Sequence, residues 1–500
     1  DSSDSLPDPV LKASRAVPPR PYTDMLVKNF FDSVNYHYGI LHQPSFMIVY
    51  VDWWSHRREV QSLRNSSTVA LTCLILRICA NSTQFLSPQN SSQLESDLGD
   101  SVRDLSKSYH EAAQTISGFL SPGSGGLVNA QQLFLSATWH KGEADFVRSW
   151  HELGAAVRQA QEIGIHMDIR SDKMSEFDLE IRRRLWCALY IWDRYADRNL
   201  AALLASFSGA NPDVPSHIIS KILENQLARQ LGEGDRPDKT NLQGKIAFVE
   251  SWMSSLPPVF SVFNPHRRWD EHYPYIPFQR LQLHCVGYMT QVILLRSILL
   301  SSDIFLTERT GAEISSENMM LLHQIVDISL KAMSVSKDTF DLCFPQQAKY
   351  YMVAFCPFDN AAFLCSLLIH DVDGTMVPRR AEVVQAVGQA LHIAHRLRGF
   401  TKMGDTTWSI LSTLKSRITL YPLERELIEE TESTGTQLAK DGVELGVDSF
   451  HHSKLNDQFQ SILDEDLRFV ENTLATDSAE FLEMDLGILD GVWNWDRVGF

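Results

Sequence analysis

Apolar residues recur every three or four positions through most of this 500-residue chain, and this helical periodicity constrains the fold more than any other feature. Residues 176–195, EFDLEIRRRLWCALYIWDRY, show it clearly. Their apolar residues share one face of a helix: Phe177, Ile181, Leu185, Ala188, Trp192 and Tyr195. Strand-like alternation is scarce, and we expect only a short extended run at 46–54, FMIVYVDWW. The sequence predicts an all-α chain, a large bundle of paired antiparallel helices without significant sheet.

The expected helices cover most of the chain before residue 400. Besides 176–195, the pattern predicts helices at 23–38, 67–80, 96–116, 130–141, 146–164, 277–300, 317–336, 358–372 and 379–399. Turn-forming stretches separate them at 121–126 and 206–215, and the polar region 228–245 is expected to be a mobile loop. The helix pairs make the fold partly solenoid-like, but no fixed repeat period is present.

Small residues are expected to bring two helices close together near residue 155. Gly154, Ala155 and Ala156 lie within the helix at 146–164 and leave room for a neighbouring helix. Gly164 can end that helix in a left-handed conformation.

The arginine run inside 176–195 raises the question of nucleic-acid binding. Asp178 precedes Arg182 by four residues, and Glu180 precedes Arg184 by four, which is the favourable order for ion pairs on a helix. Three acids therefore balance three bases and leave no surplus charge for a phosphate backbone. Ser175 and Asp178 offer a capping box at the helix start. Arg183 has no such acid and is expected on the exposed surface, whereas Trp186 is expected to be buried.

The composition is that of an ordinary globular protein, with 44% hydrophobic and 21% charged residues. No apolar run approaches the length of about 18–20 residues that spans a bilayer, so no membrane association is expected. The first residues lack an apolar signal-peptide core and an initiator Met, so we expect a piece of a longer protein. The seven cysteines form no CxxC pair, which indicates an intracellular protein without a structural zinc site in this chain.

Charge is unevenly distributed along the chain. The net charge is −17, and residues 421–500 hold 19 Asp and Glu against 5 Lys and Arg. We therefore expect a Pro- and Ser-rich linker at 1–21, an all-helical domain at 22–425, and an acidic C-terminal segment at 426–500.

Motifs for catalysis are missing from the sequence. There is no GxGxxG, P-loop, GxSxG or HExxH motif. His392 and His395 stand three apart without a carboxylate or cysteine cluster, and His140 and His151 have no nucleophile that could be named as a partner. Acidic stretches at 371–375 and 456–465 do not have the spacing of the metal-binding motifs of helical terpene cyclases. No catalytic or metal-binding residues are assigned, and the chain is not expected to be an enzyme.

Five stretches together resemble the middle homology region of fungal binuclear zinc-cluster transcription factors. They are 29–46, 149–168, 177–195, 250–260 and 282–299, and the likeness extends over about residues 22–425. The residues that match the family signature are Gly154, Arg158, Arg183, Arg184, Leu185, Trp186, Asp193 and Arg194. The resemblance implies that these residues are structural and do not contact DNA.

The chain departs from the family pattern in two places. The segment LLASFSGANPDVP stands where the family has a Gly-Arg-Pro turn, which puts in doubt any role that this turn serves. The six-cysteine zinc cluster is also missing. The resemblance places it upstream of a linker like residues 1–21, so zinc and DNA contacts are expected only from that upstream domain.

These features predict the regulatory, effector-responsive domain of a fungal transcription factor that acts in the nucleus. Its acidic tail interleaves carboxylates with apolar residues, a pattern typical of activation segments that bind coactivator or mediator-type proteins. The proposed anchors are Phe481, Met484, Leu486, Ile488, Leu489, Trp493 and Trp495. A small-molecule effector and a homodimer are possible partners, but the effector-binding residues are unknown. Two alternatives stay open: an enzyme that reuses the helical fold, and a dimeric scaffold module.

Overall fold

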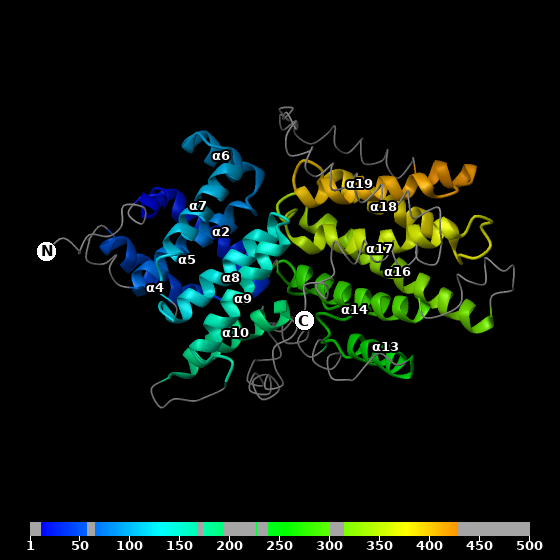
Figure 1. Cartoon of the computed structure of the whole chain (residues 1–500), viewed down its shortest axis with the longest axis horizontal. Helices are drawn as coiled ribbons and strands as arrows, with labels where there is room; N and C mark the ends of the chain where they lie inside the picture. The colour runs from blue at the N-terminus through cyan, green and yellow to red at the C-terminus, as the bar shows by residue number, and fades with distance from the viewer. Residues whose placement is uncertain are drawn as a thin grey trace. The chain divides into compact units, whose positions relative to one another are not determined.

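The computed structural model describes residues 12–57, 66–121, 123–167, 174–193, 227, 239–273, 275–300 and 315–428. The helices are α2 (Arg20–Ser33), α3 (Asn35–Tyr38), α4 (Gln43–His56), α5 (Ser66–Thr83), α6 (Pro88–Leu98), α7 (Val102–Ser117), α8 (Gly126–Gly142), α9 (Phe146–Glu162), α10 (Glu176–Asp193), α13 (Lys239–Ser254), α14 (Tyr275–Leu300), α16 (Ser316–Cys343), α17 (Tyr351–His370), α18 (Arg380–Leu397) and α19 (Lys402–Arg417). No strand occurs in these ranges. The prediction of an all-α fold is confirmed (Figure 1).

The chain divides into two compact units. Unit 1 comprises Asp1–Leu294, Ser334–Cys356 and Ile393–Trp408, and unit 2 comprises Leu295–Met333, Pro357–His392 and Ser409–Phe500. Several long helices, such as α16 and α17, contribute one part to each unit.

Helix α5 is central to the N-terminal helices of unit 1, coloured blue to cyan in Figure 1. It packs against α2, α7 and α8, and α8 packs in turn against α9 and α10. Its sequence STVALTCLILRICANST is apolar on nearly every face, so nearly every side chain from Val69 to Thr83 is buried. A helix that is apolar all round has to be covered on all sides, which explains its position.

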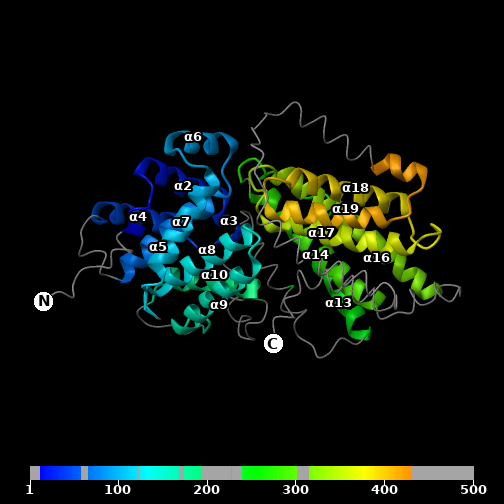
Figure 2. The same cartoon turned by 45° about the horizontal axis from the view of Figure 1, so that its top comes forward.

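Unit 2 is also helical, and parts of α16, α17 and α18 lie side by side in it in both Figure 1 and Figure 2. A buried hydrogen bond joins α16 to α17, and a partly buried ion pair joins α14 to α17. Asn360 on α17 donates to the carbonyl of Ser329 on α16 at 2.7 Å. Arg296 on α14 pairs with Asp359 on α17 at 2.8 Å.

The predicted extended run at 46–54 is wrong, because these residues belong to α4. His42 Nδ1 accepts a hydrogen bond from Ser45 N, and Pro44 lies in the first turn. This start signal outweighs the β-branched residues that suggested a strand. The predicted helix at 96–116 is divided into α6 and α7 by Gly99, whose φ is 79°.

The polar region 228–245 and the stretch after residue 400 also differ from expectation. Helix α13 begins at Lys239, inside the predicted loop, and α19 had not been predicted. Gly164 has a φ of 75° after α9, as predicted. Helix α17 is long and apolar enough to cross a membrane by composition, contrary to the sequence expectation, but 83% of its 18-residue window is buried inside the protein. We interpret α17 as a core helix.

Candidate functional site

The signature helix α10 begins with the capping box that its sequence predicts. Asp178 N donates to Ser175 Oγ at 3.1 Å, and Ser175 Oγ donates to Asp178 Oδ2 at 2.6 Å. Each residue therefore satisfies a polar group of the other.

Two of the three consecutive arginines of α10 have partners within unit 1, and the third is buried. Arg182 donates to the carbonyl of Ile163, where α9 ends, at 3.3 Å. Arg184 pairs with Glu180 at 2.8 Å, as predicted. Arg183 is only 6% exposed, so its expected surface position is wrong. The acid-first pairing rule considers only α10 itself, whereas α10 packs against both α8 and α9 and is covered on more than one face.

The apolar side chains of α10 follow the predicted face at its centre and depart from it at its start. Leu185 and Trp186 are buried, but Phe177 is 42% exposed and touches His42 edge-on at 4.8 Å between ring centres. Trp192 lies edge-on to Tyr38 and Phe134. The side chain of Asp193 and all of Arg194 lie outside the described residues.

Lys141 connects α10 with the start of α17. Its Nζ lies 4.1 Å from the ring centre of Trp192 and 3.7 Å from that of Tyr351. Both distances are within the range in which an ammonium is attracted by an aromatic face.

The loop 345–351, which precedes and enters α17, contacts the N-terminal helices through polar side chains. Gln346 Nε2 donates to Ser33 Oγ at 3.1 Å and to the carbonyl of Phe85 at 3.2 Å. Gln347 hydrogen-bonds to the hydroxyl of Tyr36. Tyr350 stacks on His37 with ring centres 4.5 Å apart. We call this contact region the 345–351 junction.

An ion pair completes the 345–351 junction. Lys349 pairs with Glu143, which also accepts from Gln84 Nε2 at 2.9 Å. Burial alone would raise the pKa of Glu143, but the ammonium of Lys349 and the two hydrogen bonds hold it below its ordinary value. Glu143 is therefore charged at neutral pH, and the junction depends on a half-buried ion pair.

A second polar cluster lies between α5, α7 and α8. Arg77 is fully buried, and its Nη1 donates to His110 Nδ1 at 2.6 Å. Its other nitrogens contact Gln114 at 2.5 Å and Gln132 at 3.5 Å. The ring of His110 stacks on Trp139 at 3.7 Å. The guanidinium is thus surrounded by neutral groups, an arrangement that requires His110 to remain uncharged.

The electrostatics of this cluster follow from burial. Burial lowers the pKa of Arg77 to about 10, although Glu152 opposes the shift. Burial and the neighbouring Arg77 lower the pKa of His110 far below its ordinary value, and burial also lowers that of His140. Sequence reasoning missed this cluster. The signal was Arg77 itself, a charged residue in the middle of the apolar run LTCLILRICA.

The histidines that were considered as catalytic bases or metal ligands lie beside aromatic rings or a single carboxylate. His140 is buried, with Nδ1 3.5 Å from Asp145, and His151 is exposed beside Trp150. His395 lies edge-on to Trp408. No group of three or more His, Cys, Asp or Glu side chains that could hold a metal ion occurs in the described part of the chain. Its seven cysteines are single buried thiols and do not fit a zinc cluster.

The acidic stretch 371–375 serves the packing of unit 2. Asp371 accepts from the backbone amides of Met376 and Val377 and pairs with Arg380 at 2.9 Å. Arg380 also pairs with Glu424 at 2.8 Å. Both carboxylate oxygens of Asp371 therefore have partners within unit 2. Residues 456–465 and the proposed activation anchors from Phe481 to Trp495 lie outside the described residues.

The remaining signature residues lie on α9. Arg158 is exposed, and a Cβ at Gly154 would meet only the guanidinium of Arg158, at 3.4 Å. Gly154 is therefore not needed for close helix approach, contrary to the expectation. Ala156, which was expected to face a neighbouring helix, is fully buried, and so is Ala160.

Comparison with known proteins finds similar sequences in the region of these helices. Residues 27–196, from α2 to just past α10, match the model of the fungal specific transcription factor domain. The chain is 26% identical over 300 residues to the "probable transcription factor sol4" of Alternaria solani, covering 55% of this chain and 53% of that protein. It is 24% identical over 459 residues to transcription factor xilB of Penicillium rubens, covering 80% of this chain and 66% of that protein.

The name of a third relative states the zinc-cluster type of that protein. The Zn(2)-C6 fungal-type transcription factor mpsB of Macrophomina phaseolina is 27% identical over 178 residues, which is 35% of this chain and 23% of that protein. The chain spans about half to two thirds of the length of the first two relatives. These relatives and the matched family are named as transcription factors and not as enzymes. The family match and these relatives together show that residues 27–196 are similar to the fungal specific transcription factor domain, and that the chain is similar to fungal transcription factors.

Proposed function

We propose that this chain is the effector-responsive regulatory part of a nuclear fungal transcription factor, and that it controls transcription through an acidic segment at 426–500. The observation that carries the proposal is the family match over residues 27–196. It is supported by the three consecutive arginines of α10: Arg182 and Arg184 bind groups of the chain itself and Arg183 is buried, so we infer that they do not contact phosphates. Contact with DNA is assigned to a zinc cluster upstream of residues 1–21.

The acidic segment provides the output in this proposal. Residues 477–500 hold six acids against one arginine, interleaved with large apolar residues. Carboxylates keep such a segment in water, while apolar anchors bind grooves on coactivator or mediator-type proteins. On a helix, Ile488, Leu489 and Trp493 lie close enough to enter one groove, because Leu489 and Trp493 are four residues apart.

In this proposal the helical domain at 22–425 receives the regulatory signal. The loop 345–351 is joined to the N-terminal helices by one ion pair, a few amide hydrogen bonds and a histidine–tyrosine stack. We propose that a small-molecule effector, or association of two copies, changes the accessibility of the acidic segment. Contacts of this polar kind are exchanged at modest cost compared with an apolar core.

A transfer experiment tests the output. Residues 477–500 are fused to an unrelated DNA-binding domain, and a reporter gene is measured. We expect activation that the double replacement Leu489→Ala with Trp493→Ala abolishes. The matched control, Asn494→Ala with Val498→Ala, should keep most of the activity. An inert wild-type fusion, or equal loss in both double variants, would refute an anchor-based activation segment.

A further inference from the structure

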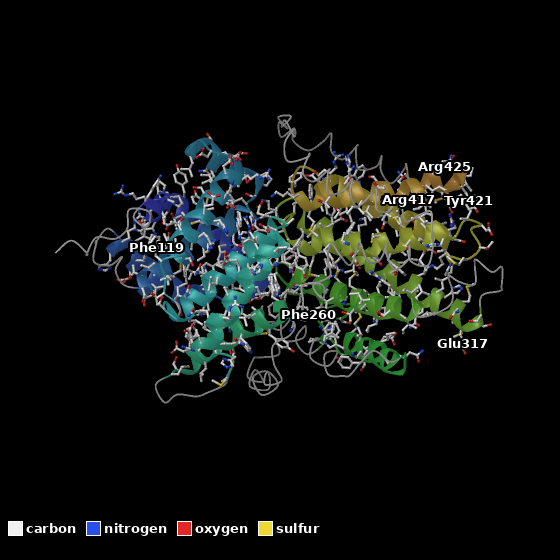
Figure 3. The ribbon with its side chains drawn as sticks, viewed as in Figure 1. Phe119, Phe260, Glu317, Arg417, Tyr421 and Arg425 are labelled. Carbon is white, nitrogen blue, oxygen red and sulfur yellow. The ribbon has the colours of Figure 1, made fainter. Side chains whose placement is uncertain are left out.

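The loop between α13 and α14 presents an aromatic residue to solvent. Phe263 is 83% exposed, more than any other large apolar side chain among the described residues. Three positions earlier, Phe260 is buried in a core cluster with Val249, Trp252 and Leu283. Figure 3 labels Phe260 and also Phe119, another exposed phenylalanine of unit 1. Phe119 is the control position in the experiment below.

A buried arginine fixes this loop. Arg280 on α14 pairs with both carboxylate oxygens of Asp270, at 2.8 and 3.0 Å. Its Nε donates to the carbonyl of Val259 at 2.7 Å. One side chain thus holds the two ends of the segment that carries Phe263, with the bidentate geometry that arginine provides.

Further contacts leave the loop little freedom. His284 Nε2 donates to the carbonyl of Phe260 at 2.8 Å, and His266 N donates to the carbonyl of Pro258 at 2.9 Å. Next to Phe263, Asn264 has a left-handed φ of 48°. A single exposed apolar residue is ordinary on a protein surface. Here, however, a buried ion pair and a left-handed residue hold that side chain in place, which lowers the entropic cost of using it as a contact.

The loop that carries Phe263 also carries two exposed arginines. Arg267 and Arg268 are exposed and make no ion pair within the described part of the chain, and Arg268 lies 4.9 Å from the ring centre of Trp269. Asp270 is neutralised by Arg280. The exposed charged side chains of the loop are therefore Arg267 and Arg268, which are positive, and Glu271, which is negative.

This combination fits an acidic segment with apolar side chains. Residues 477–500 have that chemistry, with a net charge of −5 and the anchors proposed above. The 48 residues at 429–476 could span up to about 160 Å if extended, so they place no limit on contact with any surface of a chain of this size. Tethering also raises the effective concentration of the segment at the loop.

We infer that residues 261–269 form a docking surface for an acidic amphipathic segment, and that residues 477–500 of the same chain occupy it. The inference rests on the proposed function in assigning anchors to that segment. Docking and coactivator binding would then compete for the same apolar residues.

The exposed apolar face of α4 does not fit this occupant as well. Ile48 and Val51 are exposed there, but the nearby charges are already matched. Asp52 lies 3.3 Å from His56, and Arg20 lies 3.6 Å from Asp24. In the part of that face that the structure describes, Arg20 and His56 are thus matched by carboxylates, unlike Arg267 and Arg268.

Photo-cross-linking in the full chain tests the inference. p-Benzoylphenylalanine replaces Phe263 in one variant and Phe119 in the control, since Phe119 is 51% exposed and has no basic residue within its loop. Equal amounts of isotope-labelled and unlabelled chain are mixed before irradiation. We expect same-isotope cross-links from position 263 to residues 481–495, about tenfold above those from position 119. Mixed-isotope cross-links, or yields equal to the control, would overturn the inference.

A charge-reversal variant checks the chemistry. Arg267→Glu with Arg268→Glu should lower the cross-link yield from position 263 by about tenfold, because like charges then face each other. Arg396→Glu with Arg398→Glu is the control for the change in charge, and Arg398 lies over an aromatic ring as Arg268 does. An equal decrease in both variants would show general repulsion and overturn the docking surface. An active transferred segment without cross-links would leave the proposed function standing and refute only the docking.

Discussion

At the scale of single residues, the three consecutive arginines show what a sequence can and cannot reveal. Their charge balance predicts that α10 offers no surplus positive charge to a phosphate backbone. Pairing along the helix correctly placed Arg184 beside Glu180. It failed for Arg182, which caps α9, and for Arg183, which is buried. Both errors come from neighbouring helices, which periodicity along one helix does not include.

The burial of Arg183 predicts that its replacement destabilises the chain about as much as replacement of the buried Trp186. Arg183→Ala removes a buried guanidinium and should lower the free energy of unfolding by about 3–5 kcal/mol. Trp186→Ala should have a similar effect, about 3–5 kcal/mol, because it truncates a buried aromatic side chain. Glu111→Ala, which breaks an exposed pair with Lys107, should cost less than about 1 kcal/mol. Urea denaturation measures all three, and an Arg183 variant as stable as the Glu111 variant would contradict the burial.

The buried histidine beside Arg77 predicts loss of stability in acid. The pKa of His110 is far below its ordinary value in the folded chain, because of burial and the adjacent guanidinium. The unfolded chain therefore takes up the proton first. Its contribution to stability is complete above about pH 6.5 and decreases by about 1.4 kcal/mol per pH unit below it. His110→Gln should remove that part of the slope between pH 6.5 and 5.5. Parallel slopes for the two proteins would show that His110 is not held neutral.

At the scale of elements, the periodicity of apolar residues predicted most helices, but it did not predict which residues bring two helices close together. Gly154 belongs to the family signature, yet its position has open space apart from Arg158. Gly404 on α19 gave no signal in the sequence, yet a Cβ there would lie 2.3 Å from the carbonyl oxygen of Leu397, where α18 ends. The close approach is set by the turn between two helices, which residue type alone does not define.

These two glycines therefore make a matched pair. Gly404→Ala should lower the free energy of unfolding by about 1–3 kcal/mol or more, because backbone atoms would have to move. Gly154→Ala should be neutral or stabilising by up to about 1 kcal/mol, since alanine favours a helix over glycine. Thermal melting compares them directly. Destabilisation by Gly154→Ala equal to that by Gly404→Ala would mean that α9 is packed more tightly there.

At the scale of the whole molecule, the sequence was sufficient for the fold class and for the family resemblance, because both depend on local patterns. It could not supply the 345–351 junction, in which Gln347 meets Tyr36 and Lys349 meets Glu143. These partners are more than two hundred residues apart in the chain. The conformation of the loop around Phe263 could not be predicted from the sequence either. Hydrogen bonds from Arg280 and His284 on the next helix hold this loop.

The central claim is that the whole chain controls transcription through its acidic segment. The direct measurement fuses residues 1–500 to an unrelated DNA-binding domain and compares reporter expression with that of Leu489→Ala with Trp493→Ala in the same fusion. We predict activation by the wild-type chain that the double variant loses, at equal protein levels. Expression no higher than that of the DNA-binding domain alone, or activation that the double variant fully retains, would contradict the account.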